Sequence, residues 1–140
     1  MDLALDKAMT LTIDIEPRKH YLRATVSGSY TLRSAQDVYD QAVKTAVATG
    51  HTRVLIDASA ATGAPTQDER YMLGLFVAAE QRILGAKTPP MEIHVALVGQ
   101  RPLIDPDRFG ETVAVNRGAK VKVSEELDEA LAWLGVSAGC

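Results

Sequence analysis

The stretch VLIDASAATGAPT, residues 54–66, decides the fold. Three consecutive aliphatic residues from Val54 to Ile56 predict a strand that is buried on both faces, as in a parallel sheet. Asp57 is expected to end this strand, and a loop of small and hydroxyl residues then leads to Thr66, where a helix should begin. Because ligands and partners gather at the carboxyl ends of parallel strands, this loop is the first place to look for a functional site.

Two segments upstream predict an antiparallel hairpin followed by a helix. Apolar and polar residues alternate over residues 11–15, and a second strand is expected over residues 21–27 after a short turn. Ser34 is expected to cap a helix whose apolar residues recur at helical spacing. Gly50 is a suitable residue for the C-terminal end of that helix.

Downstream of residues 54–66, helices and strands alternate. Thr66 and Glu69 have the spacing of a capping box, so a long helix is expected to begin at Thr66 and to run to about Leu84. The remaining expected elements are a strand over 93–98, a helix from Asp105-Pro106 to Gly118, a strand at 121–123 and a helix from Ser124 to Gly135. The element order β-β-α-β-α-β-α-β-α predicts one α/β domain with a mixed, mostly parallel five-stranded sheet.

The composition is that of a globular protein, with 140 residues, of which 46% are hydrophobic and 24% are charged. We expect one domain over residues 10–135, a flexible leader over 1–9 and a tail over 136–140. The net charge is −3 and basic residues are not clustered, which argues against a nucleic-acid partner. No stretch approaches the roughly 18 apolar residues of a membrane span, and the N-terminus lacks the features of a secretory signal. These features predict a cytoplasmic protein.

The sequence predicts no metal site, no cofactor and no catalytic residue. His20, His51 and His94 are far apart in the chain and lack metal-ligand spacing. Cys140 is the single cysteine, so neither an intrachain disulfide nor a cysteine metal cluster can form. Phosphate-binding glycine loops, nucleophile elbows and dinucleotide fingerprints are missing.

The element order and three short sequences resemble the STAS family of SpoIIAA-like anti-sigma-factor antagonists. The expected hairpin ends in Val26-Ser27-Gly28 before a helix, and residues 54–59, VLIDAS, are similar to the Val-hydrophobic-Asp-Leu-Ser ending of the third strand in STAS domains. Residues 129–134, EALAWL, are similar to the closing helix of bacterial SpoIIAA-like proteins. The resemblance covers about residues 10–135. It implies a non-catalytic regulatory or protein-interaction module whose partner is a kinase-like or anti-sigma-type regulator.

The chain departs from the family at the position of its regulatory motif. Antagonists carry an Asp-Ser-Ser-Gly-like motif where the helix after the third strand begins, and a kinase partner phosphorylates a serine there. This chain instead reads ATGAPT over residues 61–66. Thr62 and Thr66 are therefore the candidate phosphorylation sites, although Thr66 is better explained as the helix cap. In this respect the chain looks like the uncharacterised branch of SpoIIAA-like proteins.

The candidate site for a partner or ligand combines the loop after Ile56 with the loop after residue 98. If both strands are parallel, the two loops lie at the same edge of the sheet, where Arg101, Asp105 and Arg108 would share a crevice with Ser59. The candidate residues are Asp57, Ser59, Thr62, Gly63, Arg70, Arg101 and Asp105. Each also has a structural explanation, such as a local turn or an ion pair between Arg70 and Asp57 or Asp68.

The helix over residues 66–84 carries apolar residues around almost its whole circumference. A surface helix should show one apolar stripe and one polar face, so a second apolar face must be covered. The cover is either the long loop after Gly99, the N-terminal leader, or another molecule. The last case predicts a homodimer through this helix.

Two further functions compete with the regulatory module. A small-ligand protein would bind an apolar or anionic molecule between the helices and the sheet, and a deep apolar cavity would favour it. An enzyme would use Asp57 and Ser59, but no histidine or second carboxylate is placed by the sequence to act with them.

Overall fold

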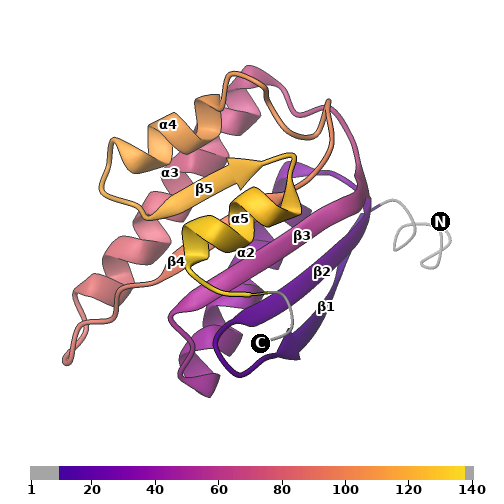
Figure 1. Cartoon of the computed structure of the whole chain (residues 1–140). Coiled ribbons are helices and arrows are strands. Elements are labelled where there is room, and N and C mark those ends of the chain that lie inside the picture. The colour runs from indigo at the N-terminus through magenta and orange to yellow at the C-terminus, as the bar shows by residue number, and fades with distance from the viewer. Residues whose placement is uncertain (1–9, 138–140) are drawn as a thin grey trace, which may run out of the picture.

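The computed structural model describes residues 10–137, which form one sheet covered by helices on both faces (Figure 1). The strands are β1 (Leu11–Pro17), β2 (Leu22–Ser29), β3 (Arg53–Thr62), β4 (His94–Val98) and β5 (Val121–Ser124). The helices are α2 (Leu32–Thr49), α3 (Gln67–Gly85), α4 (Phe109–Val115) and α5 (Leu127–Leu134). The predicted element order and mixed sheet are confirmed. The predicted leader over 1–9, Cys140 and most of the predicted tail lie outside the described residues.

The sheet has the strand order β1-β2-β3-β4-β5. β1 and β2 form the predicted antiparallel hairpin, whereas β2, β3, β4 and β5 run parallel to one another. The carboxyl ends of four strands therefore share one edge of the sheet. This edge is where the segments leading into α2, α3 and α4 begin.

Three helices cover one face of the sheet and α5 covers the other (Figure 1). The central strand β3 contributes to both cores, because successive side chains point to opposite faces. Val54 and Ile56 belong to the core under α2 and α3, and Leu55 belongs to the core under α5. The continuous apolar run at residues 54–56 is thus explained by burial on both sides.

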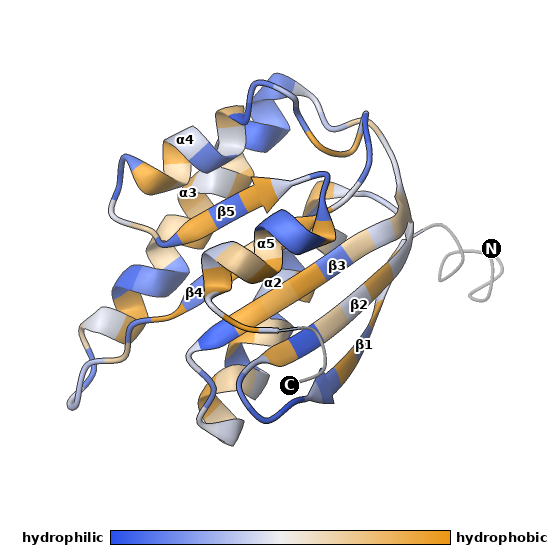
Figure 2. Cartoon of the chain, viewed as in Figure 1, coloured by the Kyte–Doolittle hydropathy of each residue, from blue (hydrophilic) through white to orange (hydrophobic). Residues whose placement is uncertain are grey.

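β3 continues past Asp57, where the sequence predicted its end. After a register shift, Ala60, Ala61 and Thr62 pair with the last three residues of β2. The shift places one extra β3 residue between two paired positions, which is a bulge. Beyond Asp57, β3 has no partner on its β4 side. Figure 2 shows the hydrophobic colouring of β3 becoming paler towards this end, and this loss of apolar residues explains why the segment was interpreted as a loop.

The start of α3 agrees with the prediction and the start of α2 does not. The Thr66 hydroxyl accepts a hydrogen bond from Glu69 N at 3.1 Å, and the Glu69 carboxylate accepts one from Thr66 N at 2.9 Å. In α2 the N-cap is Thr31, and Ser34 is the third helical residue of the same kind of box. The prediction that Ser34 caps α2 is therefore wrong. In a capping box the side chain at the third helical position accepts a hydrogen bond from the N–H of the N-cap residue. Serine can fill either position, so the local sequence alone does not distinguish them.

Two later helix starts also differ from the prediction. The Asp105 carboxylate accepts hydrogen bonds from the backbone N–H groups of Asp107 and Phe109, so residues 105–108 form a turn before α4. Ser124 is the last residue of β5 and its hydroxyl bonds to the backbone of Glu126, so it does not cap α5. In both cases the side chain forms hydrogen bonds to backbone groups in the turn before the helix and is not the N-cap of that helix.

The second apolar face of α3 is covered only in part. Gly74 lies against α4, where a Cβ atom would be 2.7 Å from Gly110 O and 2.9 Å from Val113 Cβ. Tyr71 stacks on Phe109 with ring centroids 6.5 Å apart. Met72 and Ile83 remain 50% and 60% exposed. Among residues 10–137, the segment after Gly99 therefore covers part of this face through α4, while the leader, the second cover considered, lies outside the described residues.

The close approach of α3 and α4 gives a stability prediction. Gly74→Ala should lower the free energy of unfolding by about 1–3 kcal/mol, because the new methyl group meets the α4 backbone and overpacks the interface. Gly85→Ala is the matched control in the same helix, where a Cβ atom meets nothing within 4 Å. Urea denaturation measures both. An equal or higher stability of Gly74→Ala would contradict the close contact.

Candidate functional site

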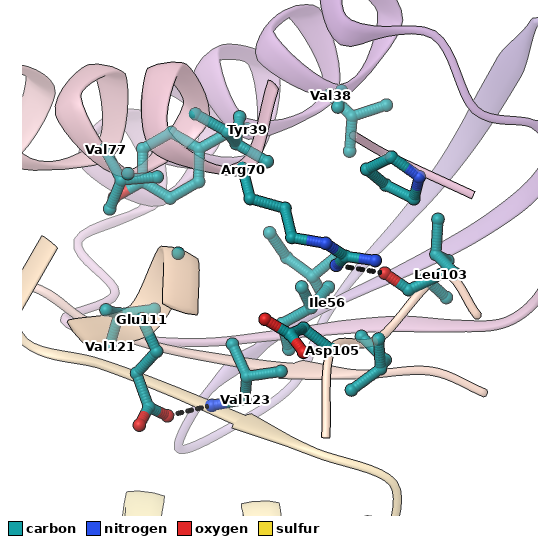
Figure 3. A pocket seen from close by; sticks show the side chains of 18 of the residues that line it. Val38, Tyr39, Ile56, Arg70, Val77, Leu103, Asp105, Glu111, Val121 and Val123 are labelled. Carbon is teal, nitrogen blue, oxygen red and sulfur yellow. Dashed lines mark hydrogen bonds between the residues drawn. The ribbon is translucent and has the colours of Figure 1, made fainter. Parts of the chain in front are cut away.

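An apolar cavity of about 150 Å³ lies between the sheet and the helices α2, α3 and α4 (Figure 3). Its walls include Val26 and Ile56 from the sheet and Val38, Tyr39 and Val77 from the helices. The cavity is comparable in size to engineered cavities of roughly 150 Å³ that bind benzene or xenon. Protein interiors are close-packed, so a void of this size in a domain of this length requires an explanation.

The explanation is the use of small residues at the interface between the helices and the sheet. The small lining residues are Ala35, Ala58, Ala61, Gly74, Gly110 and Ala114. Ala35 lines the cavity from α2, and Ala58, inside the β3 bulge, and Ala61, just after it, line it from the sheet. The bulge matters because Ala58 and Ala61 are three residues apart, which would place them on opposite faces of a regular strand.

Four charged residues also line the cavity, and we call Arg70, Asp105, Arg108 and Glu111 the charged rim. Arg70 reaches from α3 to the loop before α4, where its guanidinium donates to Leu103 O at 3.0 Å (Figure 3). It also donates to Pro102 O at 2.8 Å. Glu111 accepts a hydrogen bond from Val123 N at 2.6 Å. These bonds tie α3, α4, β5 and the loop together around the cavity.

The remaining members of the charged rim are also held in place. Burial acts to raise the pKa of Asp105, but hydrogen bonds from Asp107 N and Phe109 N, together with the charge of Arg70, leave that pKa below its usual value. Asp105 therefore stays ionised opposite Arg70. Arg108 has the left-handed backbone angle φ of 55°, and its guanidinium lies 3.6 Å from the Glu129 carboxylate. Each charge of the rim thus has a partner within the protein.

Tyr30 is a site residue that the sequence did not identify. It follows the end of β2 and lines the cavity, and its hydroxyl oxygen is buried with no hydrogen-bond partner among residues 10–137. Burial raises the pKa of Tyr30 to about 12; the charge of Glu69 adds to this shift and Arg70 opposes it. The rule that placed the site at the carboxyl ends of parallel strands could have found Tyr30, because β2 is parallel to β3.

Thr62 and Gly63, both predicted site residues, support Tyr30. The Thr62 carbonyl oxygen accepts a hydrogen bond from Tyr30 N at 2.8 Å. Gly63 has φ of +138°, and a Cβ atom there would lie 2.6 Å from Tyr30 Cβ. Glycine is therefore required at position 63 both for the backbone angle and for the approach of the tyrosine.

Asp57 and Ser59 lie away from the cavity. Because Ile56 and Ala58 line it, the alternation of the strand directs Asp57 to the opposite face of the sheet. There the carboxylate pairs with the Arg23 guanidinium at 3.0 Å and accepts hydrogen bonds from Ser59 N and Ser59 Oγ at 3.1 and 2.7 Å. The expected pair between Arg70 and Asp57 is not formed.

The expected crevice shared by Ser59 with the loop after β4 is also not formed. Arg101 points to Glu125, with a distance of 3.0 Å between Arg101 Nε and Glu125 Oε1. Of the predicted site residues, only Arg70 and Asp105 line the cavity, joined by Arg108, which the sequence placed in the same loop. The Thr66 hydroxyl is engaged as the cap of α3, and whether Thr62 or Thr66 is phosphorylated stays a prediction.

The mixed sheet, its strand order and its two unequal helical layers form an α/β fold that is also found in a solved structure of another protein. An anti-sigma factor antagonist from Mycobacterium paratuberculosis has this fold, with 21% sequence identity, coverage of 90% of this chain and 95% of that chain, and a TM-score of 0.55. An uncharacterised protein with a SpoIIAA-like fold from Shewanella loihica is 23% identical, with coverage of 89% and 93% and a TM-score of 0.47. At such identities the likeness concerns the fold alone.

No family model and no curated protein sequence matches the chain. Within residues 10–137, no helix has the length and apolar character needed to cross a bilayer. In the same part of the chain, no three acidic, histidine or cysteine side chains are grouped as metal ligands would be.

The Arg23–Asp57 ion pair gives a second prediction. Both side chains are largely buried, at 21% and 15% exposure, so Asp57→Ala should lower the free energy of unfolding by about 1–3 kcal/mol by leaving the guanidinium without its partner. Adding Arg23→Met should recover part of this loss, because the pair is then removed together. Urea denaturation of the two single variants and the double variant measures the coupling. Additivity within about 0.3 kcal/mol would show that the pair contributes nothing.

The two tyrosines that line the cavity predict a loss of stability at high pH. Burial raises the pKa of Tyr39, like that of Tyr30, to about 12; the hydrogen bond from Gln81 opposes the shift and Glu80 adds to it. In the unfolded chain both phenols ionise near pH 10, so stability should be unaffected below about pH 10 and fall as the pH rises towards 12.

Phenolate absorbance and unfolding measurements between about pH 9 and 12 test this prediction. The Tyr30→Phe and Tyr39→Phe variants should each reduce the alkaline loss of stability. Complete ionisation of all four tyrosines of the folded protein near pH 10 would contradict it.

Proposed function

We propose that this chain is a non-catalytic STAS-like regulatory module that binds a small apolar molecule in the cavity. The single observation that carries the proposal is the apolar space of about 150 Å³ between the sheet and α2, α3 and α4. Transfer of an apolar molecule from water into such a space is favourable, and the walls need not rearrange to receive it. Binding of this kind requires no catalytic group.

The arrangement of polar groups supports binding over catalysis. Asp57 and Ser59, the pair that an enzyme would have used, lie on the opposite face of the sheet and bond to each other. The charged rim is engaged in bonds to the backbone and to other side chains. A general acid or base needs a free position beside the reacting atom, and these groups are already occupied.

The position of the cavity suggests how a ligand would act on a protein partner. Arg70, a member of the charged rim, lies one residue before the exposed Tyr71 and Met72 on α3. A ligand that fills the cavity would stabilise the observed arrangement of α3 and the loop at 101–108 by mass action. A kinase-like or anti-sigma-type partner that contacts α3 would then bind the ligand-bound protein and the empty protein with different affinities.

Toluene tests the binding step. We expect saturable chemical-shift changes at the methyl groups that line the cavity when toluene is titrated into the labelled protein. Ala35→Leu should fill part of the space, weaken toluene binding by about tenfold or more and raise the free energy of unfolding by about 0.5–2 kcal/mol. A variant that is more stable but binds less would separate loss of the cavity from loss of the fold.

The matched control is Ala48→Leu, which adds the same atoms at an exposed position of the same helix, α2, outside the cavity. It should leave toluene binding unchanged. Shift changes that do not saturate, or equal toluene affinities of the wild type and Ala35→Leu, would overturn the proposed function.

Self-association through α3 is a second proposal, carried by its exposed apolar residues. Met72, Leu75, Ala79 and Ile83 recur at helical spacing along one side of α3, and Met72 and Ile83 are half or more exposed. A stripe of this kind can pair with its own copy about a two-fold axis. The predicted homodimer through residues 66–84 would cover it.

Analytical ultracentrifugation tests the homodimer. The wild type should sediment as a dimer at high micromolar concentration, and Ile83→Asp should sediment as a monomer because it places a charge in the stripe. Glu80→Asp, which keeps the charge in the same helix, is the control. Monomeric wild type at the highest concentration would contradict the homodimer and leave the cavity proposal untouched.

A further inference from the structure

The Tyr30 hydroxyl is a buried polar group without a hydrogen-bond partner among the described residues, and Tyr30 lines the cavity. Buried polar atoms in folded proteins nearly always have a partner, and leaving one without it destabilises the fold. The backbone of Tyr30 is held in place, since its N–H is bonded to the Thr62 carbonyl and its Cβ lies against Gly63. The unpaired Tyr30 hydroxyl therefore suggests a hydrogen-bond partner from outside the chain.

We propose that the ligand of the cavity is a neutral molecule with an apolar body and one hydrogen-bond acceptor, and that this acceptor takes the hydrogen bond of the Tyr30 hydroxyl. The inference rests on the proposed function and adds the chemical class of the ligand. Ketones, esters and amides of about six to ten non-hydrogen atoms have the required size for a cavity that is close to those that hold benzene.

The hydroxyl acts as the donor because it stays protonated. Burial disfavours the phenolate, and Glu69 opposes it further. At neutral pH the group can therefore give its proton to an oxygen lone pair of the ligand. An apolar ligand without an acceptor would leave the hydroxyl as it is in the empty protein, unpaired.

The surroundings favour a neutral ligand over an anion. Arg70 already donates to Pro102 and Leu103 and lies near the ionised Asp105. Arg108 is directed to Glu129. Both cations that line the cavity thus have negative or carbonyl partners, and moving an unpaired carboxylate out of water into the apolar space would be strongly unfavourable.

A matched pair of ligands tests the proposal: cyclohexanone and methylenecyclohexane, in which a CH₂ group replaces the carbonyl oxygen. Dissociation constants are measured by chemical-shift titration of the wild type, Tyr30→Phe and Tyr39→Phe. We expect Tyr30→Phe to weaken cyclohexanone binding by about three- to tenfold and to leave methylenecyclohexane binding nearly unchanged. Tyr39→Phe is the control, because Tyr39 lines the same cavity and its hydroxyl already has Gln81 as its partner.

Two further measurements test whether Tyr30→Phe changes binding indirectly, by disturbing the fold. The unliganded Tyr30→Phe protein should melt no lower than the wild type, because the variant removes an unpaired hydroxyl. The carbonyl carbon of ¹³C-labelled cyclohexanone should move downfield on binding to the wild type, as a new hydrogen bond requires, and this reading does not depend on any variant.

The outcomes separate the inference from the proposed function. If none of the apolar molecules binds the wild type, including toluene, the proposed function itself fails. Both ring compounds could bind, with the ratio of cyclohexanone affinity to methylenecyclohexane affinity the same in the wild type and in Tyr30→Phe. In that case the cavity is a binding site and the role of Tyr30 is overturned. If cyclohexanecarboxylate binds the wild type more tightly than cyclohexanone does, the neutral class is overturned.

Discussion

The burial of β3 on both faces is the constraint on which the rest of the structure depends. The strand lies between β2 and β4, with α2 and α3 on one side and α5 on the other. Successive side chains are therefore assigned to opposite cores: Ile56 to the cavity side and Asp57 to the side of α5 and Arg23. A carboxylate can occupy this central strand because Arg23, on the neighbouring strand β2, supplies an ion-pair partner at 3.0 Å and Ser59 donates two hydrogen bonds.

The cavity results from the way in which the helices meet this sheet. Small residues on β3 and at the contact between α3 and α4 bring backbones close together without filling the space beneath. Arg70 then fixes the loop at 101–108 beside the cavity by two hydrogen bonds to carbonyl groups. Arg70, which the sequence suggested as the partner of Asp57, therefore holds this loop in place. The candidate site lies on the face of β3 opposite Asp57, and not in the loop after Ile56 where the sequence placed it.

The likeness to an anti-sigma factor antagonist describes the fold and leaves the function to the site. The site differs from what the family resemblance implied. The segment at 61–66 has no Asp-Ser-Ser-Gly-like motif, the Thr66 hydroxyl caps α3, and Thr62 and Gly63 support a buried tyrosine. The segment at 61–66, where the family resemblance led us to expect a phosphorylation site, contributes Ala61 and Pro65 to the wall of an apolar cavity, which is why we propose a ligand as the regulatory input.

The sequence by itself determined the features that depend on neighbouring residues. The apolar run at 54–56, the capping box at Thr66 and the helix ends at Gly50 and Gly135 are local, since each rests on a side chain or backbone preference within a few residues. Only the tertiary structure decided the extension of β3 to Thr62, the pairing of Asp57 with Arg23 and the burial of the Tyr30 hydroxyl. These depend on the register between strands and on how closely the helices approach, and a single chain pattern does not encode distances between segments that are far apart in the sequence.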